Sequence, residues 1–136
     1  MKYKKLIIYT DGGARGNPGP AGCGAVIFDE HKNIIAEISE FIGKATNNQA
    51  EYQAVVFAIK KAREFTAEIL DFYLDSELVV KQLNREYKVK NKELALLFVQ
   101  IYNETLNFKK VSFSHIRREF NKEADKLANL AMDRGI

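Results

Sequence analysis

The stretch LIIYTDGG, residues 6–13, decides the fold of this chain. Its first five residues are typical of a short strand, and the strand ends on an acid, Asp11, which two glycines follow. A second apolar strand, 69–74, ends in the same way on Asp75. If these two strands are neighbours and parallel, the sequence predicts an acidic edge of a sheet.

The rest of the chain supplies the other elements of an α/β fold. Further strands are expected over 22–28, 33–41 and 111–115, and helices over 47–65, 76–83, 93–105 and from Lys122. Residues 29–32 are expected to form a hairpin turn, and Thr46 to cap the first helix. The order βββαβααβα predicts a five-stranded mixed sheet, three antiparallel strands and then parallel ones, with helices on both faces. Right-handed crossovers would place the first strand beside the fourth.

Composition and length fit one globular domain, residues 1–136, with 46% hydrophobic and 29% charged residues. The net charge of +3 suits a polyanionic partner, but it is equally ordinary for a soluble protein. The apolar stretch near the start is too short for a signal peptide or a membrane span, so we expect a cytoplasmic protein that does not bind membranes.

The glycine- and proline-rich stretch 12–24 lies between two expected strands, and we expect a functional loop there. It contains Cys23, the single cysteine of the chain, which excludes an internal disulfide and a multi-cysteine zinc site. We expect this cysteine to be a small buried packing residue rather than a reactive thiol.

Asp11 and Asp75 would converge if their strands are adjacent, about 4.8 Å apart. Converging carboxylates repel, and burying them is costly unless they are paired or bound to a metal. A divalent cation is the simplest reason for such a pair. Taken singly, each acid has an ordinary alternative: Asp11 could form an Asx turn, and Asp75 could cap a helix.

Four motifs together resemble ribonuclease H of the type 1 class. They are TDGG at 10–13 with GNPGPAG at 16–22, TNNQAE at 46–51, LDS at 74–76 and NKEADKLA at 121–128. The resemblance spans the chain and implies the ribonuclease H-like fold. It also implies that Asp11, Glu51, Asp75 and Asp125 form one acidic cluster, although Glu51 could lie on a solvated helix face and Asp125 could simply favour a first helical turn.

The resemblance further implies the chemistry of this cluster. The four acids would bind two Mg²⁺ ions, which Mn²⁺ can replace, and the enzyme would hydrolyse the RNA strand of RNA/DNA hybrids to 5′-phosphate and 3′-hydroxyl ends. Arg118 is a candidate to stabilise charge on the phosphate, and His115 is a candidate proton shuttle. His115 could equally be a residue that merely ends a strand, because its loop lacks the glycines of a mobile loop.

Substrate-binding residues also follow from the resemblance. Asn17, Asn48 and Gln49 would face the RNA minor groove, Thr46 and Asn47 would hold a DNA phosphate, and Gly12 and Gly13 would lie against the substrate. Helix capping is the alternative for the two asparagines at 47 and 48.

The chain departs from many bacterial members in its short connector, residues 84–92, and in having no tryptophan. Tyr87, Lys88 and Lys90 are candidates to replace the missing basic insertion and aromatic contact, although a solvated lysine-rich loop would have the same composition. We therefore predict weaker and more salt-sensitive binding of hybrid. Glu77, where the family often has glutamine, has no assigned role.

Three other readings compete with a hybrid-specific ribonuclease. The first is a non-catalytic nucleic-acid-binding module of the same fold, which the four acids disfavour. The second is a transposase-type or junction-resolving nuclease, which would lack the TNNQAE and GNPGP motifs. The third is a fragment of a reverse transcriptase. We expect a stand-alone monomer that binds RNA/DNA hybrid, and the sequence leaves binding of duplex RNA open.

Overall fold

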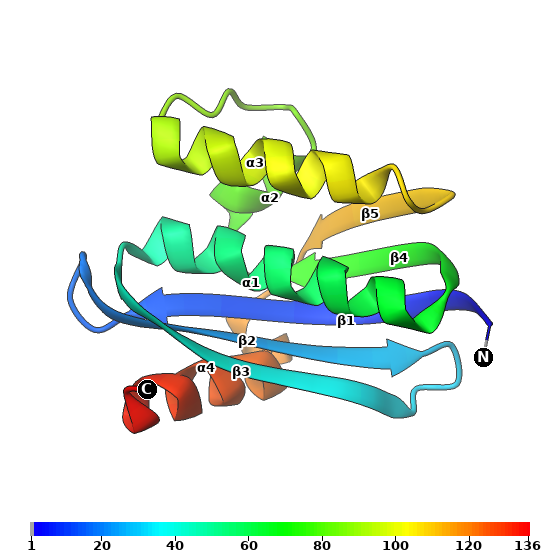
Figure 1. Cartoon of the computed structure of the whole chain (residues 1–136), viewed down its shortest axis with the longest axis horizontal. Helices are drawn as coiled ribbons and strands as arrows, with labels where there is room; N and C mark the ends of the chain where they lie inside the picture. The colour runs from blue at the N-terminus through cyan, green and yellow to red at the C-terminus, as the bar shows by residue number, and fades with distance from the viewer. Residues whose placement is uncertain (1) are drawn as a thin grey trace.

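The computed structural model describes residues 2–136, and its elements follow the expected order (Figure 1). They are β1 (Tyr3–Ala14), β2 (Gly19–Asp29), β3 (Ile34–Ala45), α1 (Asn47–Ala62), β4 (Ala67–Leu74), α2 (Glu77–Leu83), α3 (Lys92–Thr105), β5 (Lys110–His115) and α4 (Lys122–Arg134), with 3-10 turns at Arg63–Phe65 and Arg118–Phe120. The helix expected over 47–65 therefore ends earlier, and its last turn tightens before Thr66, whose φ of 53° is left-handed.

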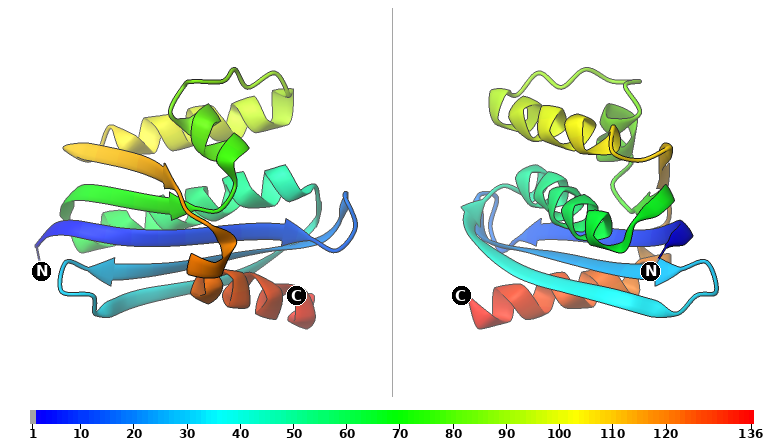
Figure 2. Two further views of the ribbon diagram at one scale, coloured as in Figure 1. Left: turned by 180° about the vertical axis from the view of Figure 1, so that it is seen from behind. Right: turned by 45° about the vertical axis from the view of Figure 1, so that its right-hand side comes forward.

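The five strands form one mixed sheet in the order β3-β2-β1-β4-β5. β2 is antiparallel to β1 and β3, whereas β4 is parallel to β1 and β5. Thr10 lies opposite Leu74, so the next residue on each of these neighbouring strands is an acid. Figure 2 shows α1, α2 and α3 on one face of the sheet and α4 on the other. The predicted fold, including β1 beside β4, is confirmed.

The expected loop over 12–24 is wrong in extent. β1 continues to Ala14 and β2 already begins at Gly19, so the connection is only four residues, 15–18. The glycines are strand positions on which helices lie directly. A Cβ on Gly12 would lie 2.2 Å from the Ala50 carbonyl oxygen of α1, and a Cβ on Gly24 would lie 2.2 Å from the Ala124 carbonyl oxygen of α4. Glycine therefore serves close packing of helix on sheet here.

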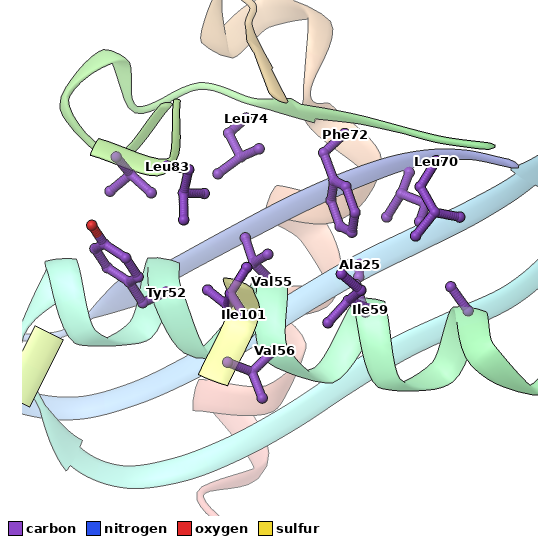
Figure 3. Close-up of a cluster of buried hydrophobic side chains, with 14 of the residues drawn as sticks. Ala25, Tyr52, Val55, Val56, Ile59, Leu70, Phe72, Leu74, Leu83 and Ile101 are labelled. Carbon is purple, nitrogen blue, oxygen red and sulfur yellow. The ribbon is translucent and has the colours of Figure 1, made fainter. Parts of the chain in front are cut away.

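The main core lies between the sheet and α1, which α3 covers from outside. Figure 3 shows Val55, Val56 and Ile59 of α1 among side chains of the sheet, such as Phe72, and of neighbouring helices. α1 is buried along most of its length because it is a middle layer. Its position fixes every residue that it carries, including Glu51.

The hairpin turn at residues 29–32 and the helix cap at Thr46 are present as predicted. The Asp29 carboxylate accepts hydrogen bonds from the backbone amides of His31 and Asn33, both at 2.9 Å, and so holds the hairpin turn. Thr46 and Gln49 form a reciprocal capping box at the start of α1.

Cys23 is buried, as predicted, and its thiol donates to the Ala50 carbonyl oxygen at 3.3 Å. Within residues 2–136, no helix has the length and hydropathy needed to span a membrane.

Candidate active site

A cleft of about 510 Å³ opens where β1 and β4 end, between α1 and α4. All four predicted acids line it, each from a different element or its end. Asp11 lies in β1, Glu51 in the second turn of α1, Asp75 directly after β4 and Asp125 in the first turn of α4. Strand pairing brings the first and third together, and the two helices bring the others from opposite faces of the sheet.

Burial and mutual repulsion dominate the electrostatics of the cleft. Burial is the main cause that raises the pKa of Asp11 to about 8, and the negative charges of Asp75 and Asp125 add to it. Burial and the charge of Asp75 raise the pKa of Glu51 to about 7, against the opposing effects of Ser76 and Arg118. Near neutral pH the cleft therefore holds protons that a bound cation would displace.

The donor set of the cleft fits a hard divalent cation. The candidate donor atoms of the cleft are carboxylate oxygens. The positive charge of Arg118 lowers the pKa of Glu51. Arg15 also lines the cleft, but it pairs with Asp133 at 2.7 Å. Among residues 2–136, no three acidic, histidine or cysteine side chains already surround one point as ligands.

Two asparagines, the buried Asn121 and the half-buried Asn129, hold the acids, and neither was predicted from the sequence. The Asn121 side-chain amide donates to the Thr10 carbonyl oxygen at 2.9 Å and to the Asp75 carboxylate at 3.0 Å. Its backbone carbonyl accepts from the amide of Asp125 at 3.1 Å. Asn121 is 1% exposed, so one residue ties together the segments that carry three of the acids. It begins the NKEADKLA motif, which was the available signal.

The second asparagine supports Asp125 alone. The Asn129 side-chain amide donates to the Asp125 carboxylate at 3.3 Å and to its backbone carbonyl at 3.0 Å. It lies one helical turn further along α4 and also lines the cleft. Its spacing from Asp125 was the only sequence signal for this contact.

The ordinary alternatives do not apply to three of the four acids. Asp11 is part of a strand rather than a turn, and Ser76, not Asp75, caps α2 by accepting from the Val79 amide at 3.3 Å. Glu51 lines the cleft instead of a solvated face, whereas Asp125 does lie in a first helical turn as well as in the cleft.

Arg118 and His115, the two residues predicted to assist catalysis, lie in different places in the structure. Arg118 lines the acidic cleft from the 3-10 turn that follows β5. His115 ends β5 opposite Leu74, is exposed and does not line the cleft. The structure therefore brings Arg118 to the acids and leaves His115 at the end of its strand.

A smaller hollow of about 270 Å³ lies beside the start of α1 and contains four of the predicted substrate residues. It is lined by Asn17, Thr46, Asn48, Gln49, Asn91, Glu93 and Leu94. Asn91 and Glu93, from the start of α3, were missed, because nothing in the sequence indicates that the two helix starts meet. The carboxylate of Glu93 accepts from the Gln49 side-chain amide, so the hollow carries one acid.

Asn47 occupies a different place from its neighbours. It lines the acidic cleft together with Gly12 and Gly13, and its side-chain oxygen accepts from the Ala14 amide at 2.8 Å. Its own backbone amide donates to the Asn17 side chain at 3.0 Å. These bonds fasten the short 15–18 loop to the start of α1, so the grouping of Thr46 with Asn47 in one pocket is not what the structure shows.

Tyr87, Lys88 and Lys90 of the connector line neither hollow. Tyr87 is 50% exposed, and the Lys81 ammonium group lies 5.1 Å from its ring centre. Lys88 and Lys90 are exposed, as is Glu77 at the start of α2. None of these residues lines the acidic cleft.

Sequence comparisons agree over nearly the whole chain. A family model described as Reverse transcriptase-like matches residues 9–131. The bifunctional protein Rv2228c of Mycobacterium tuberculosis is 42% identical over 130 residues, which are 95% of this chain but only 36% of that protein. The Ribonuclease H of Clostridium botulinum is 35% identical over 150 aligned positions, which cover 96% of this chain and 97% of that enzyme.

Solved structures give the same result. The N-terminal RNase H domain of Rv2228c has a TM-score of 0.92 at 41% identity, with 95% of this chain and 99% of that domain covered. LC11-RNase H1, solved in complex with an RNA/DNA hybrid, has a TM-score of 0.90 at 43% identity, with coverages of 95% and 97%. The fold, the four acids and these matches together place the chain in the ribonuclease H family, in its type 1 class.

Proposed function

We propose that the chain is an endoribonuclease that hydrolyses the RNA strand of RNA/DNA hybrids. The observation that carries the proposal is the single cleft lined by Asp11, Glu51, Asp75 and Asp125. A relative of 43% identity that was solved with an RNA/DNA hybrid supports the choice of substrate.

Asp11, Glu51, Asp75 and Asp125 would hold two Mg²⁺ ions, which Mn²⁺ can replace. When bound, such ions supply an activated water for in-line attack and stabilise the leaving 3′-oxygen, which yields 5′-phosphate and 3′-hydroxyl ends. The chain's own groups orient this chemistry. Asn121 holds the Asp75 carboxylate from the side, and Arg118 offers a guanidinium to the charge that develops on the scissile phosphate.

Selection of the hybrid falls to the amide-rich hollow beside α1. Asn17, Asn48 and Gln49 offer both donors and acceptors, which suits contact with a 2′-hydroxyl of the RNA strand. Thr46 would approach a DNA phosphate at the helix start, and Tyr87, Lys88 and Lys90 would contact the DNA backbone further along. The cytoplasmic location and the monomeric state stay predictions from the sequence, which leaves binding of duplex RNA open.

Incubation with an end-labelled RNA/DNA hybrid in Mg²⁺ tests the proposal. Single-stranded RNA, duplex RNA and duplex DNA serve as parallel substrates, and EDTA and the Asp75→Asn variant as controls. We expect the RNA strand of the hybrid to be cut, and the cutting to stop with EDTA or the variant. If folded protein cuts no substrate in Mg²⁺ or Mn²⁺ but still binds hybrid, the chain is a non-catalytic nucleic-acid-binding module.

A further inference from the structure

The connector between α2 and α3 is fastened along its length. Near its start, the backbone amides of Glu86 and Tyr87 both donate to the Lys81 carbonyl oxygen, at 2.8 and 3.3 Å. Near its end, Val89 packs against the main core, and the Asn91 side chain caps α3. The composition of this segment fits a solvated loop as well as a binding element, but its contacts are those of a held segment.

One buried side chain links the middle of the connector to α1. Gln82 of α2 is 7% exposed. Its side-chain oxygen accepts from the Tyr52 hydroxyl at 2.6 Å, and its side-chain amide donates to the Lys88 carbonyl oxygen at 3.5 Å. Figure 3 shows the Tyr52 hydroxyl directed toward α2, beside Leu83. Tyr52 is fully buried and directly follows Glu51 of the acidic cleft.

We infer that Gln82 is a positioning residue that sets where the basic connector lies relative to Glu51. Through it, the exposed Lys88 and Lys90 keep a fixed distance from the acids, so the DNA backbone they contact is placed relative to the scissile RNA phosphate. The inference rests on the proposed function for the role of the connector, but not for the Tyr52–Gln82–Lys88 chain itself.

The two hydrogen bonds that join Tyr52, Gln82 and Lys88 call for an amide side chain at position 82. The Tyr52 hydroxyl needs an acceptor and the Lys88 carbonyl needs a donor, and a glutamine side chain supplies both. A buried amide without partners would be costly, so packing alone does not explain glutamine at this site. Glutamate would keep the acceptor and lose the donor, whereas methionine would fill the same space and lose both.

Kinetics and hydrogen exchange of Gln82→Met and Gln82→Glu test the inference. The control is Gln100→Met, the same change at a half-buried glutamine of α3 outside this chain of contacts. We expect both position-82 variants to raise KM for hybrid about tenfold, with kcat within about twofold, because the substrate is misplaced rather than the acids. Amide exchange should quicken over residues 86–90 and stay unchanged in β1. Gln100→Met should behave like the parent in both measurements.

The outcomes separate this inference from the proposed function. The inference is wrong if both position-82 variants keep the KM of the parent protein and its rates of amide hydrogen exchange over residues 86–90. A parent protein that cuts no hybrid would overturn the proposed function, while exchange would still decide whether Gln82 holds the connector. If the position-82 variants do not fold, Tyr52→Phe, which removes only the first hydrogen bond, decides by the same two measurements.

Discussion

The acidic cleft and the basic connector are built in opposite ways. The acids of the cleft come from four elements spread over more than a hundred residues, and buried contacts hold them. The cations of the connector lie within one short exposed segment, which a few hydrogen bonds and one apolar side chain hold. The proposed function therefore assigns the chemistry to residues that the fold brings together, and the affinity for substrate to an exposed segment.

The largest effect expected from this contrast is that of Asp11→Asn. It removes a proposed metal ligand, so hybrid cleavage in Mg²⁺ should fall by roughly a thousandfold or more. The same change removes the cost of keeping a buried acid at this position, either protonated or charged, so the melting temperature in EDTA at neutral pH should rise. Cleavage assays and thermal melts measure the two effects, with Glu68→Gln at an exposed acid of β4 as control. A variant that keeps a tenth of the activity would contradict the assignment.

Arg118→Ala and His115→Ala form the next test, because only the first residue lines the cleft. Removing a cation that faces developing charge should lower kcat about a hundredfold. His115→Ala should stay within about threefold of the parent. Single-turnover cleavage at saturating hybrid compares the two variants directly. Equal losses, or a larger loss for His115→Ala, would return the proton-shuttle role to the histidine.

Asn121→Ala should affect both activity and stability. Because it releases the Asp75 carboxylate, we expect kcat and Mg²⁺ affinity to fall about 10- to 100-fold. The Thr10 carbonyl loses its side-chain donor as well, so the free energy of unfolding should fall by about 1–3 kcal/mol. Urea unfolding and Mg²⁺ titration measure these changes against the exposed Asn107→Ala. Loss of stability with unchanged Mg²⁺ affinity would limit Asn121 to a structural role.

The double variant Lys88→Ala/Lys90→Ala tests the other side of the comparison. It should raise KM for hybrid and reduce the slope of log affinity against log salt concentration by about two, roughly one for each lost phosphate contact. Lys60→Ala/Lys61→Ala at the far end of α1 carries the same charge change away from the connector. Matching salt slopes in the two double variants would mean that the connector lysines are merely solvated.

The smallest expected effect is a dependence of stability on pH without metal. The pKa of Asp11 is about 8 in the folded chain and that of an ordinary aspartate is 3.8, so folding takes up a proton between these values. Stability from this group is complete below about pH 4 and is lost as the pH rises through 8. In EDTA, the melting temperature should fall from pH 5 to pH 8. Millimolar Mg²⁺ or Asp11→Asn should flatten this slope, and an unchanged slope in the variant would assign it to other groups.

The sequence predicted the sheet order and the acidic edge because both depend on patterns that act locally. Apolar strands, the cap at Thr46 and the four motifs each have a signal within a few residues. The extent of β1 and β2 was not predictable in this way. Asp11 to Ala14 is poor in strand-forming residues, and it stays extended because it pairs with β2 and because α1 lies directly on Gly12.

The contacts of Asn121 and Gln82 could not be predicted from the sequence for the same reason. Asn121 reaches Thr10 and Asp75 across long sequence separations, and Gln82 reaches Tyr52 of another helix. Apart from the NKEADKLA motif that Asn121 begins, nothing in the neighbourhood of these residues distinguishes them from surface amides. Only their burial and their partners, which the assembled fold supplies, reveal what they do.

The glycines of β1 and β2 also bear on how such chains diverge. At Gly12 and Gly24 the main chain of a helix rests on the main chain of a strand, with no side chain between them. The spacing of Asp11, Glu51 and Asp125 is then set by backbone contact and does not vary with the size of nearby apolar residues. Related chains are free to exchange core residues while the acids stay in register, whereas a single added methyl group at either glycine would displace one of them.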